Sequence, residues 1–343
     1  MAFARRERVC FLTDQTFLPI IIAAIILYAF LNGLHDSSGL VAAAISSRSI
    51  NPRAALLLAS LAEFAGPFLF GTEVAATIGN DLVDPRAVTL QVLLVAISSA
   101  IIWNLVTWYF GLPSSSTHAL LGGLVGAVTL AGGFQSLLLS GFAKVLFALF
   151  ISPLIGLGAG YLFMEATLYL TQNSTPHINE FFKRVQWFNV VALALSHGTN
   201  DGQKSMGLIA MALVAARSQT SFAIPLWATL LCAIALTLGV NSAGWRIMKT
   251  LGGGIYRLRP VHAFAAQTAS ASIILGAAIL GAPVSTTQVV SASIMGVGSA
   301  ERIRSVRWQV AGQIVTGWLL TIPASALVAA ALSVLLPRLG LGA

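Results

Sequence analysis

Two short stretches of the sequence place an aspartate, glycines and polar side chains inside apolar surroundings. The stretches "LNGLHDSSGL" (31–40) and "SHGTNDGQKSMG" (196–207) share the pattern Gly-x-(His/Asn)-Asp, so that Asp36 corresponds to Asp201. Residues of these types unwind a helix and supply ligands where the backbone lines a cavity. A helix cap or an interhelical hydrogen bond would explain one such aspartate, but the repeated pair favours a role in handling charge.

A second pair of stretches predicts two helix starts. In "LPSSSTHA" (112–119) and "APVSTTQV" (282–289), a proline precedes Ser and Thr residues, and an apolar run follows. Proline favours the first helical turn, a hydroxyl caps it, and the first N–H groups stay free. Such a helix end binds oxyanions in a water-poor cavity, although ordinary capping at a loop is the commoner fate of these motifs. Their occurrence as a pair favours anion binding.

The two kinds of motif constrain each other. Two aspartates beside an anion site would repel a doubly charged oxyanion unless bound Na⁺, bound protons or a metal–anion pair neutralise them. A site that accepts the anion only with a cation is the site of a symporter. Lys204 could contact the anion, but we favour an ion pair with Asp201, three residues earlier. His35, His118 and His197 could relay protons or orient a serine.

Other polar and small residues in the apolar runs rank lower as functional candidates. Glu63, in "AEFAGP", is a secondary candidate that could pair across helices, and Gln267 is as consistent with packing as with function. The GxxxG spacings at 122/126 and 156/160 predict close helix packing rather than ligand contact.

These motifs interrupt a chain that is otherwise suited to lipid. Of its 343 residues, 57% are hydrophobic and only 9% are charged, whereas a soluble domain has about 25% charged residues. A spanning helix needs about 20 apolar residues. Long apolar runs cover 17–34, 54–79, 87–111, 140–163, 187–216, 222–241, 262–281 and 309–337. With the shorter runs 113–131 and 283–298, we expect roughly eight to ten membrane segments.

The same composition excludes several classes of function. The net charge of +8 comes largely from loop Lys and Arg residues, which is the orientation signal of a membrane protein and not a nucleic-acid-binding surface. Cys10 and Cys232 lie far apart without metal spacing. The sequence contains no Walker lysine motif, zinc spacing or nucleophile elbow. We therefore expect no enzymatic activity, no cofactor and no assigned metal site.

Internal similarity predicts a two-fold repeat. Besides the aspartate and proline motifs, "GTEVAATIG" (71–79) matches "GWRIMKTLG" (244–252) at both outer glycines. The three matches occur in the same order and at similar offsets. We predict a first transmembrane repeat over 1–170 with a hairpin tip near 113–118, a linker over 171–186, and a second repeat over 187–343 with a tip near 283–288.

Loop charge predicts that the two repeats have opposite orientations. Basic residues flank the second hairpin on both sides: Arg246, Lys249, Arg257, Arg259, Arg302, Arg304 and Arg307. Because basic loops face the cytoplasm, residues 262–298 should enter and return from that side. The matching flanks in the first half, 80–86 and the stretch around Lys144, are poorly basic. The predicted fold is an all-α polytopic membrane protein with two inverted-topology repeats, discontinuous helices and two re-entrant hairpins.

At these residues the chain resembles the inorganic phosphate transporter (PiT) family, of the bacterial low-affinity type. The segment "NGLHDSSGLVAAAISSRSINPR" (32–53) is similar to the first signature of that family, and "SHGTNDGQKSMGLIA" (196–210) is similar to the second. The stretches "PSSSTH" and "PVSTTQ" resemble its two hairpin tips. The four motifs cover nearly the whole chain in order.

The resemblance implies secondary transport of phosphate, driven by Na⁺ in some members and by protons with metal–phosphate in others. It implies anion contacts from Ser115, Ser116, Thr117, Ser285, Thr286, Thr287, Gln203 and Lys204. It assigns the co-transported H⁺ or Na⁺ to Asp36, Asp201, Asn200 and His35. The expected partners are inorganic phosphate and the lipid bilayer, with a homodimer left open. The expected location is the plasma membrane, as a multi-pass protein of a bacterial inner membrane.

Departures from the family pattern leave alternatives open. Ser37, Ser38 and Gly39 stand where Ala-Ala-Asn is usual, which removes an amide ligand. Gln288 replaces the usual histidine of the second tip, and Gln267 stands where the family often has Glu. A permease for sulfate or another tetrahedral oxyanion is therefore an alternative, and so is an uncoupled anion channel. An enzyme acting on phosphate esters is disfavoured, because the sequence shows no carboxylate–histidine metal cluster.

Overall fold

The described part of the chain is a bundle of α-helices. The computed structural model describes residues 2–242, 251 and 254–338, and the side chains of 17–242, 251 and 254–336. The first half contains α1 (Ala2–Ser46), α2 (Pro52–Leu69), α3 (Glu73–Asn80), α4 (Leu90–Phe110), α5 (Ser116–Gly132) and α6 (Leu139–Thr171). The second half contains α7 (Ile178–Ala215), α8 (Leu226–Asn241), α10 (Pro260–Ile279), α11 (Thr286–Arg302) and α12 (Trp308–Arg338).

The predicted all-helical membrane fold is confirmed, but the helix breaks expected at the two signatures are absent. The helices α1 and α7 run without interruption through 31–40 and 196–207. Five described helices are long and apolar enough to cross a membrane, and there are six spans if α2 and α3, bent by 70°, are counted as one. This number is below the eight to ten segments expected from apolar runs. The helices α5 and α8 are shorter apolar helices, and the 38-residue α7 carries the polar second signature in its middle.

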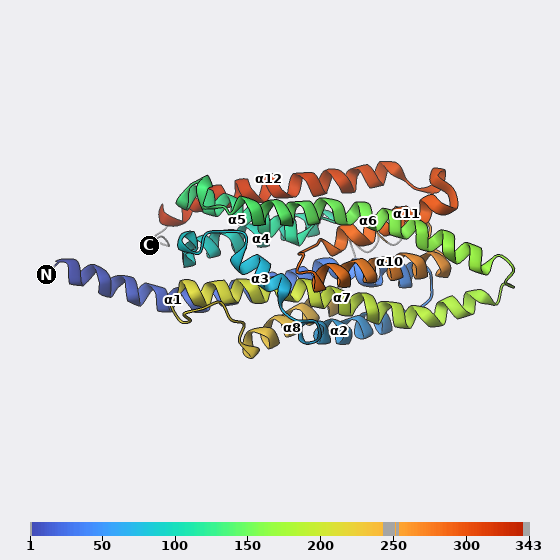
Figure 1. Cartoon of the computed structure of the whole chain (residues 1–343), viewed down its shortest axis with the longest axis horizontal. Coiled ribbons are helices and arrows are strands. Elements are labelled where there is room, and N and C mark those ends of the chain that lie inside the picture. Colours follow the sequence, from blue (N-terminus) through green and yellow to red (C-terminus); the bar gives the residue numbers. More distant parts are fainter. Residues whose placement is uncertain (1, 243–250, 252–253, 339–343) are drawn as a thin grey trace.

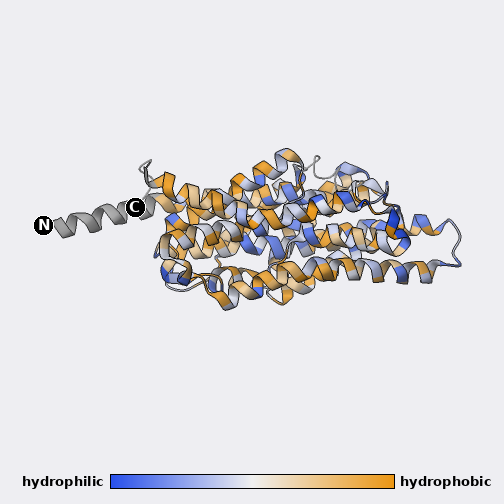
Figure 2. Cartoon of the chain, turned by 90° about the horizontal axis from the view of Figure 1, so that it is seen from above, coloured by the Kyte–Doolittle hydropathy of each residue, from blue (hydrophilic) through white to orange (hydrophobic). Residues whose placement is uncertain are grey.

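Figure 1 shows the long helices lying side by side along the longest axis of the molecule, with the turn between α6 and α7 at one end. Hydrophobic residues predominate along the helices in Figure 2. Large apolar side chains face outward, for example Leu154, Leu162 and Leu327, which are 65%, 66% and 72% exposed. Such a surface is stable against lipid chains and would be unfavourable in water.

The two halves pack by exchanging helices. The first helix of each half contacts the second helix of the other, so that α1 packs on α8 and α7 packs on α2. Both crossings are close: a Cβ on Gly33 would lie 2.1 Å from the Leu236 carbonyl oxygen, and one on Gly198 would lie 2.3 Å from that of Glu63. Only glycine permits these approaches.

A second pair of crossings also joins a helix of one half to a helix of the other, because α5 packs on α12 and α11 packs on α6. The predicted close packing at the GxxxG spacings is present here. A Cβ on Gly126 would lie 2.3 Å from the Ala326 carbonyl oxygen, and one on Gly160 would lie 2.3 Å from that of Ser293. The exchange of helices is the pattern expected of a two-fold repeat, which we retain as a proposal together with the re-entrant hairpins.

Two helical hairpins carry the proline motifs. The chain reverses after α4 and after α10 at Gly111 (φ 66°) and Gly281 (φ 70°), in a backbone region that favours glycine. In Figure 1, α5 and α11 extend from the middle of the bundle toward opposite ends. Both tips therefore lie at the centre of the molecule.

The predicted boundaries of the repeats stay predictions. The helix α7 begins at Ile178, so that part of the predicted linker 171–186 is helical. The third internal match falls largely on residues 243–250 and 252–253, which lie outside the described residues, as does the end of the second repeat at 339–343.

Candidate functional site

The two proline motifs form helix starts that meet. Ser115 and Ser285 have extended backbones, and their hydroxyls accept hydrogen bonds from the N–H groups of His118 (3.1 Å) and Gln288 (3.4 Å). The Thr117 hydroxyl donates to the Val284 carbonyl oxygen across the junction, at 3.3 Å. All the predicted tip residues are buried, with exposures of 1 to 3%. The tips thus share one enclosed region.

Asp36, in the C-terminal part of α1, contacts the second tip directly. Its carboxylate accepts hydrogen bonds from the hydroxyls of Thr286, at 3.3 Å, and Thr287. His35 Nδ1 lies 3.7 Å from the same carboxylate. The side chain of Asp36 is buried, so its charge is compensated by these neighbours and not by water.

Asp201, on α7, reaches the first tip through a lysine. Lys204 Nζ lies 2.7 Å from the Asp201 carboxylate, and the predicted ion pair is therefore present. The same ammonium donates to the Thr117 hydroxyl at 2.6 Å and to the Val284 carbonyl at 2.8 Å. Lys204 is fully buried and has its three protons engaged.

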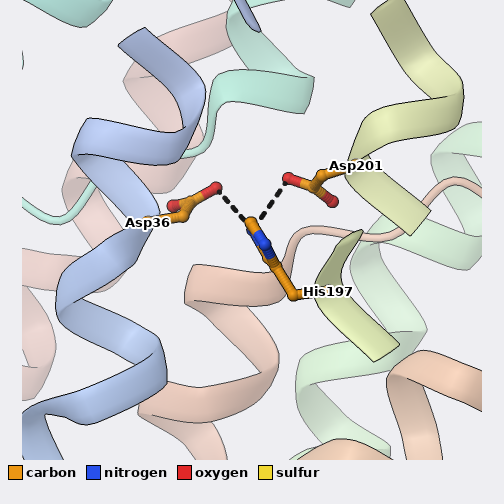
Figure 3. Close-up of side chains that lie close together, drawn as sticks. All are labelled: Asp36, His197 and Asp201. Atoms are coloured by element: carbon orange, nitrogen blue, oxygen red, sulfur yellow. Dashed lines mark hydrogen bonds and ion pairs between the residues drawn. The ribbon is translucent and has the colours of Figure 1, made fainter. Parts of the chain in front are cut away.

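His197 joins the two aspartates. Its Nε2 lies 3.5 Å from Asp36 and 3.3 Å from Asp201, as Figure 3 shows. Its Nδ1 lies 2.5 Å from Glu63 on α2, so the predicted pairing of Glu63 across helices is confirmed. Ligand atoms of Asp36, His197 and Asp201 lie within 4.8 Å of one another, in a group that could hold a metal ion.

The expectation that the chain lacks a carboxylate–histidine cluster is therefore wrong. Asp36 lies on α1 and the other two residues lie on α7, and these helices are distant in the sequence but packed together. Spacing along the chain carries no signal for a cluster assembled in this way. The group by itself does not indicate catalysis.

His35 and Asn200, which were predicted to bind the coupling ion, contact the hairpin tips. Asn200 donates to the Ala282 carbonyl at 3.1 Å and accepts from the Val284 N–H at 3.3 Å. His35 Nε2 lies 3.4 Å from the hydroxyls of both Ser114 and Thr107. Each signature therefore positions the tip of its own half.

The remaining predicted residues are Gln203, Ser116 and Gln267. Gln203 accepts hydrogen bonds from the N–H groups of Val74 (2.9 Å) and Ala75 (3.3 Å) at the start of α3, whereas its Nε2 has no hydrogen-bond partner among the described residues. The Ser116 hydroxyl likewise has no partner there. Gln267 donates to the Leu40 carbonyl oxygen at 2.8 Å, on α1 four residues beyond Asp36.

Two site residues were not singled out from the sequence. Asn32 donates to the Asp201 carboxylate at 3.1 Å, and the Tyr28 hydroxyl donates to the Ser116 carbonyl oxygen at 3.1 Å. Both precede Asp36 by four and eight residues, which places all three on one face of a helix. This helical spacing in the sequence could have identified Tyr28 and Asn32 as neighbours of Asp36.

Comparison with known proteins agrees with this geometry. A family model described as "Phosphate transporter family" matches residues 32–179 and 165–329. The chain belongs to the phosphate transporter family. A "Probable low-affinity inorganic phosphate transporter" of Bacillus subtilis is 42% identical to it, over 90% of this chain and 93% of the relative. A protein of the same description from Rhizobium meliloti is 41% identical, with the same coverage.

A solved structure has the same fold. The structure titled "The sodium-dependent phosphate transporter" matches with a TM-score of 0.85 and 26% sequence identity. The match covers 94% of this chain and 99% of the chain in that structure. The relatives are transporters rather than enzymes. With the apolar helices described above, the family membership identifies a multi-pass protein of the plasma membrane.

Proposed function

We propose that this member of the phosphate transporter family is a secondary active transporter that moves inorganic phosphate together with a cation. One observation supports this most strongly: two capped helix starts and two aspartates, from both halves of the chain, form one buried cluster. The names of the relatives support phosphate as the substrate.

The anion is bound between the tips. Each tip offers the free N–H groups of a helix start, which favour negative charge. The hydroxyls of Ser116 and Thr286 lie at these starts, and the Ser116 hydroxyl is without a partner among the described residues. Lys204 adds a positive charge at the junction of the two tips. A tetrahedral anion would accept hydrogen bonds from both halves at once.

The charge balance requires a cation. The carboxylates of Asp36, Glu63 and Asp201 lie in one cluster with the Lys204 ammonium and with two imidazoles, those of His35 and His197. With the three carboxylates ionised and His35 neutral, this cluster keeps a net negative charge even when His197 is protonated, and it would repel phosphate at short range. A cation beside Asp36 and Asp201 removes the repulsion. The relative titled as sodium-dependent supports Na⁺, which prefers carboxylate and carbonyl oxygens, and a proton is the alternative.

Transport would proceed by alternating access around this fixed site. The burial of both tips corresponds to a closed state, in which neither side of the membrane reaches the anion. If the halves are inverted repeats, the two hairpins approach the site from opposite sides. Movement of one hairpin away from its carboxylate or lysine contact would open one side only.

The test is uptake by the purified protein in proteoliposomes. We expect radiolabelled phosphate to accumulate above its equilibrium level when an inward Na⁺ or proton gradient is imposed, and to equilibrate when the gradient is dissipated. Equilibration under both conditions would identify an uncoupled channel instead. Accumulation of sulfate in place of phosphate would identify a permease for another oxyanion, which the departures at Ser37, Ser38 and Gly39 keep as the second candidate.

A further inference from the structure

A basic cavity lies away from the hairpin tips, where α1 ends and where α10 and α12 begin. It is a cavity of about 560 Å³ lined by Ser46, Ser47, Arg48, Arg257, Leu258, Arg259, Pro260 and Arg307. Ligand-binding cavities usually have volumes of roughly 300 to 1,000 Å³. Four of these eight lining residues are arginines, and none is acidic. None of them belongs to the tips or to the aspartate cluster.

The positive charge of this cavity is only partly compensated. Glu301, at the end of α11, pairs with Arg259 and with His262, and it accepts a hydrogen bond from Tyr256. Its carboxylate is therefore already occupied by three groups. Arg48 and Arg257 form no ion pair within the described part of the chain, and both are exposed. Like charges gathered in one cavity are unfavourable unless an anion binds between them.

The backbone of Arg48 adds an independent observation. Its φ of 56° lies in the left-handed region, which glycine and asparagine adopt more easily than other residues. The Arg48 N–H closes the turn at the end of α1 by donating to the Ile45 carbonyl at 3.0 Å. Any residue except proline can form that bond, and glycine would do so with less strain. An arginine at this position brings a guanidinium to the cavity.

We propose that this cavity binds a phosphate-bearing anion at the cytoplasmic end of the protein, separately from the transport site. The planar guanidinium groups of Arg48 and Arg257 match the oxygens of a phosphate group and can donate to them in pairs. The basic loops place this end of the bundle on the cytoplasmic side. The bound anion bridges the end of α1 to the segment that leads into α10 and the second hairpin.

The first arm of the test uses a soluble probe. The full-length protein in neutral phosphatidylcholine nanodiscs is titrated with tripolyphosphate by isothermal titration calorimetry, at low and high salt. We expect the double variant Arg48→Gln/Arg257→Gln to weaken binding by about tenfold or more, because each arginine donates charged hydrogen bonds. Arg184→Gln is the matched control, since Arg184 is exposed near the start of α7 and does not line the cavity; its affinity should stay within about twofold.

The second arm distinguishes a lipid headgroup from a free phosphate. Nanodiscs of mixed phosphatidylglycerol and phosphatidylcholine are analysed by native mass spectrometry for acidic lipids retained by the wild type and the double variant. Selective loss of phosphatidylglycerol from the double variant supports a headgroup, and loss of tripolyphosphate binding supports a soluble anion. Binding of neither probe to the wild type, or equal binding by the double variant, overturns the proposal.

The transport site is tested apart from this cavity. Thr286→Val should retain tripolyphosphate binding, because Thr286 lies at the second tip and not in the cavity. Loss of tripolyphosphate binding in this variant would show that the probe occupies the transport site, and the proposal would be wrong even if phosphate uptake is as proposed above.

Discussion

The two signatures place matching residues around the site but give them different charges. In their alignment, Asp36 corresponds to Asp201 and Asn32 corresponds to His197. The contacts cross between the halves: Asn32 donates to Asp201 at 3.1 Å, and His197 lies 3.5 Å from Asp36. Asp201 therefore has a neutral amide beside it, whereas the titratable ring of His197 lies between the two acids, at 3.3 Å from Asp201 as well. The matching positions are arranged alike in the two halves, but their side chains differ in charge.

The clearest difference is at the position three residues after each aspartate. The second half has Lys204 there, and the first half has Gly39. Asp201 consequently has a permanent counter-charge, whereas Asp36 is held by hydroxyls and imidazoles. From this difference we infer that Asp36 and Asp201 have separate roles. We propose that Asp201 with Lys204 forms the fixed part of the site, and that Asp36 is the acid whose charge the co-transported cation neutralises.

The largest effect should follow removal of the charge at Asp36. We expect Asp36→Asn to reduce gradient-driven phosphate uptake in proteoliposomes to background, because the site loses the principal negative charge that binds the cation. The amide oxygen can still accept a hydrogen bond from one of the two threonines and the amide NH2 can donate to the hydroxyl of the other, so the protein should remain folded in detergent by size-exclusion chromatography. Glu180→Gln, at an exposed acid of α7, is the control and should transport normally. Wild-type accumulation by Asp36→Asn would refute the division of tasks.

The next largest effect concerns the fixed pair. Asp201→Asn leaves the buried ammonium of Lys204 without its counter-charge, which costs about 3 to 5 kcal/mol of stability. Thermal unfolding in detergent should show this loss for Asp201→Asn and a smaller loss for the double variant Asp201→Asn/Lys204→Met, in which no buried charge is stranded. If the double variant were the less stable of the two, the lysine would not be acting as a counter-charge in the folded protein.

Much of this site was accessible from the sequence, because its parts are local motifs. The proline before Ser115 and Ser285 predicts a capped helix start, and both serines form that cap in the structure. The short spacing from Asp201 to Lys204 predicts an ion pair on one helix, and the pair is present. Such features depend on residues within one turn of each other.

The parts that were missed depend on how distant helices pack. Glu63 was expected to pair across helices, but its partner, His197 on α7, was not identified, and neither was the contact between Asp36 on α1 and Thr287 on α11. Alignment of the halves shows which positions correspond, but it does not show that each aspartate reaches the tip of the other half. The contacts of Asn200 with the backbone of the second tip were also not predictable, since an amide can bind either an ion or backbone groups and the sequence does not distinguish these partners.

A smaller effect on phosphate affinity is expected at the second tip. We expect Thr286→Val to weaken apparent phosphate affinity by about 1.5 to 3 kcal/mol, the worth of a hydrogen bond to a charged group. The measurement is the phosphate concentration for half-maximal uptake under a fixed gradient. Thr316→Val, at an exposed threonine of α12 that bonds only to its own helix at 2.8 Å, is the matched control. An affinity equal to that of the wild type would mean that the second tip does not contact the anion.

The smallest effect is expected where the tips touch. Gln288 Nε2 lies 3.4 Å from both ring nitrogens of His118, which is near the limit of a hydrogen bond. Gln288→Ala should therefore change apparent phosphate affinity by less than about 1 kcal/mol. His118→Ala should have the larger effect, because His118 Nδ1 also lies 2.7 Å from the hydroxyl of Ser115, which caps α5.

Comparison of these two variants in one uptake assay tests whether the tips are equivalent. Although Gln288 and His118 occupy matching positions, only the histidine makes a close contact with the serine of its own tip. If Gln288→Ala impaired phosphate affinity as strongly as His118→Ala, the contact between the tips would matter more than the cap within each tip. The asymmetry inferred for the aspartates would then not extend to the two hairpin tips.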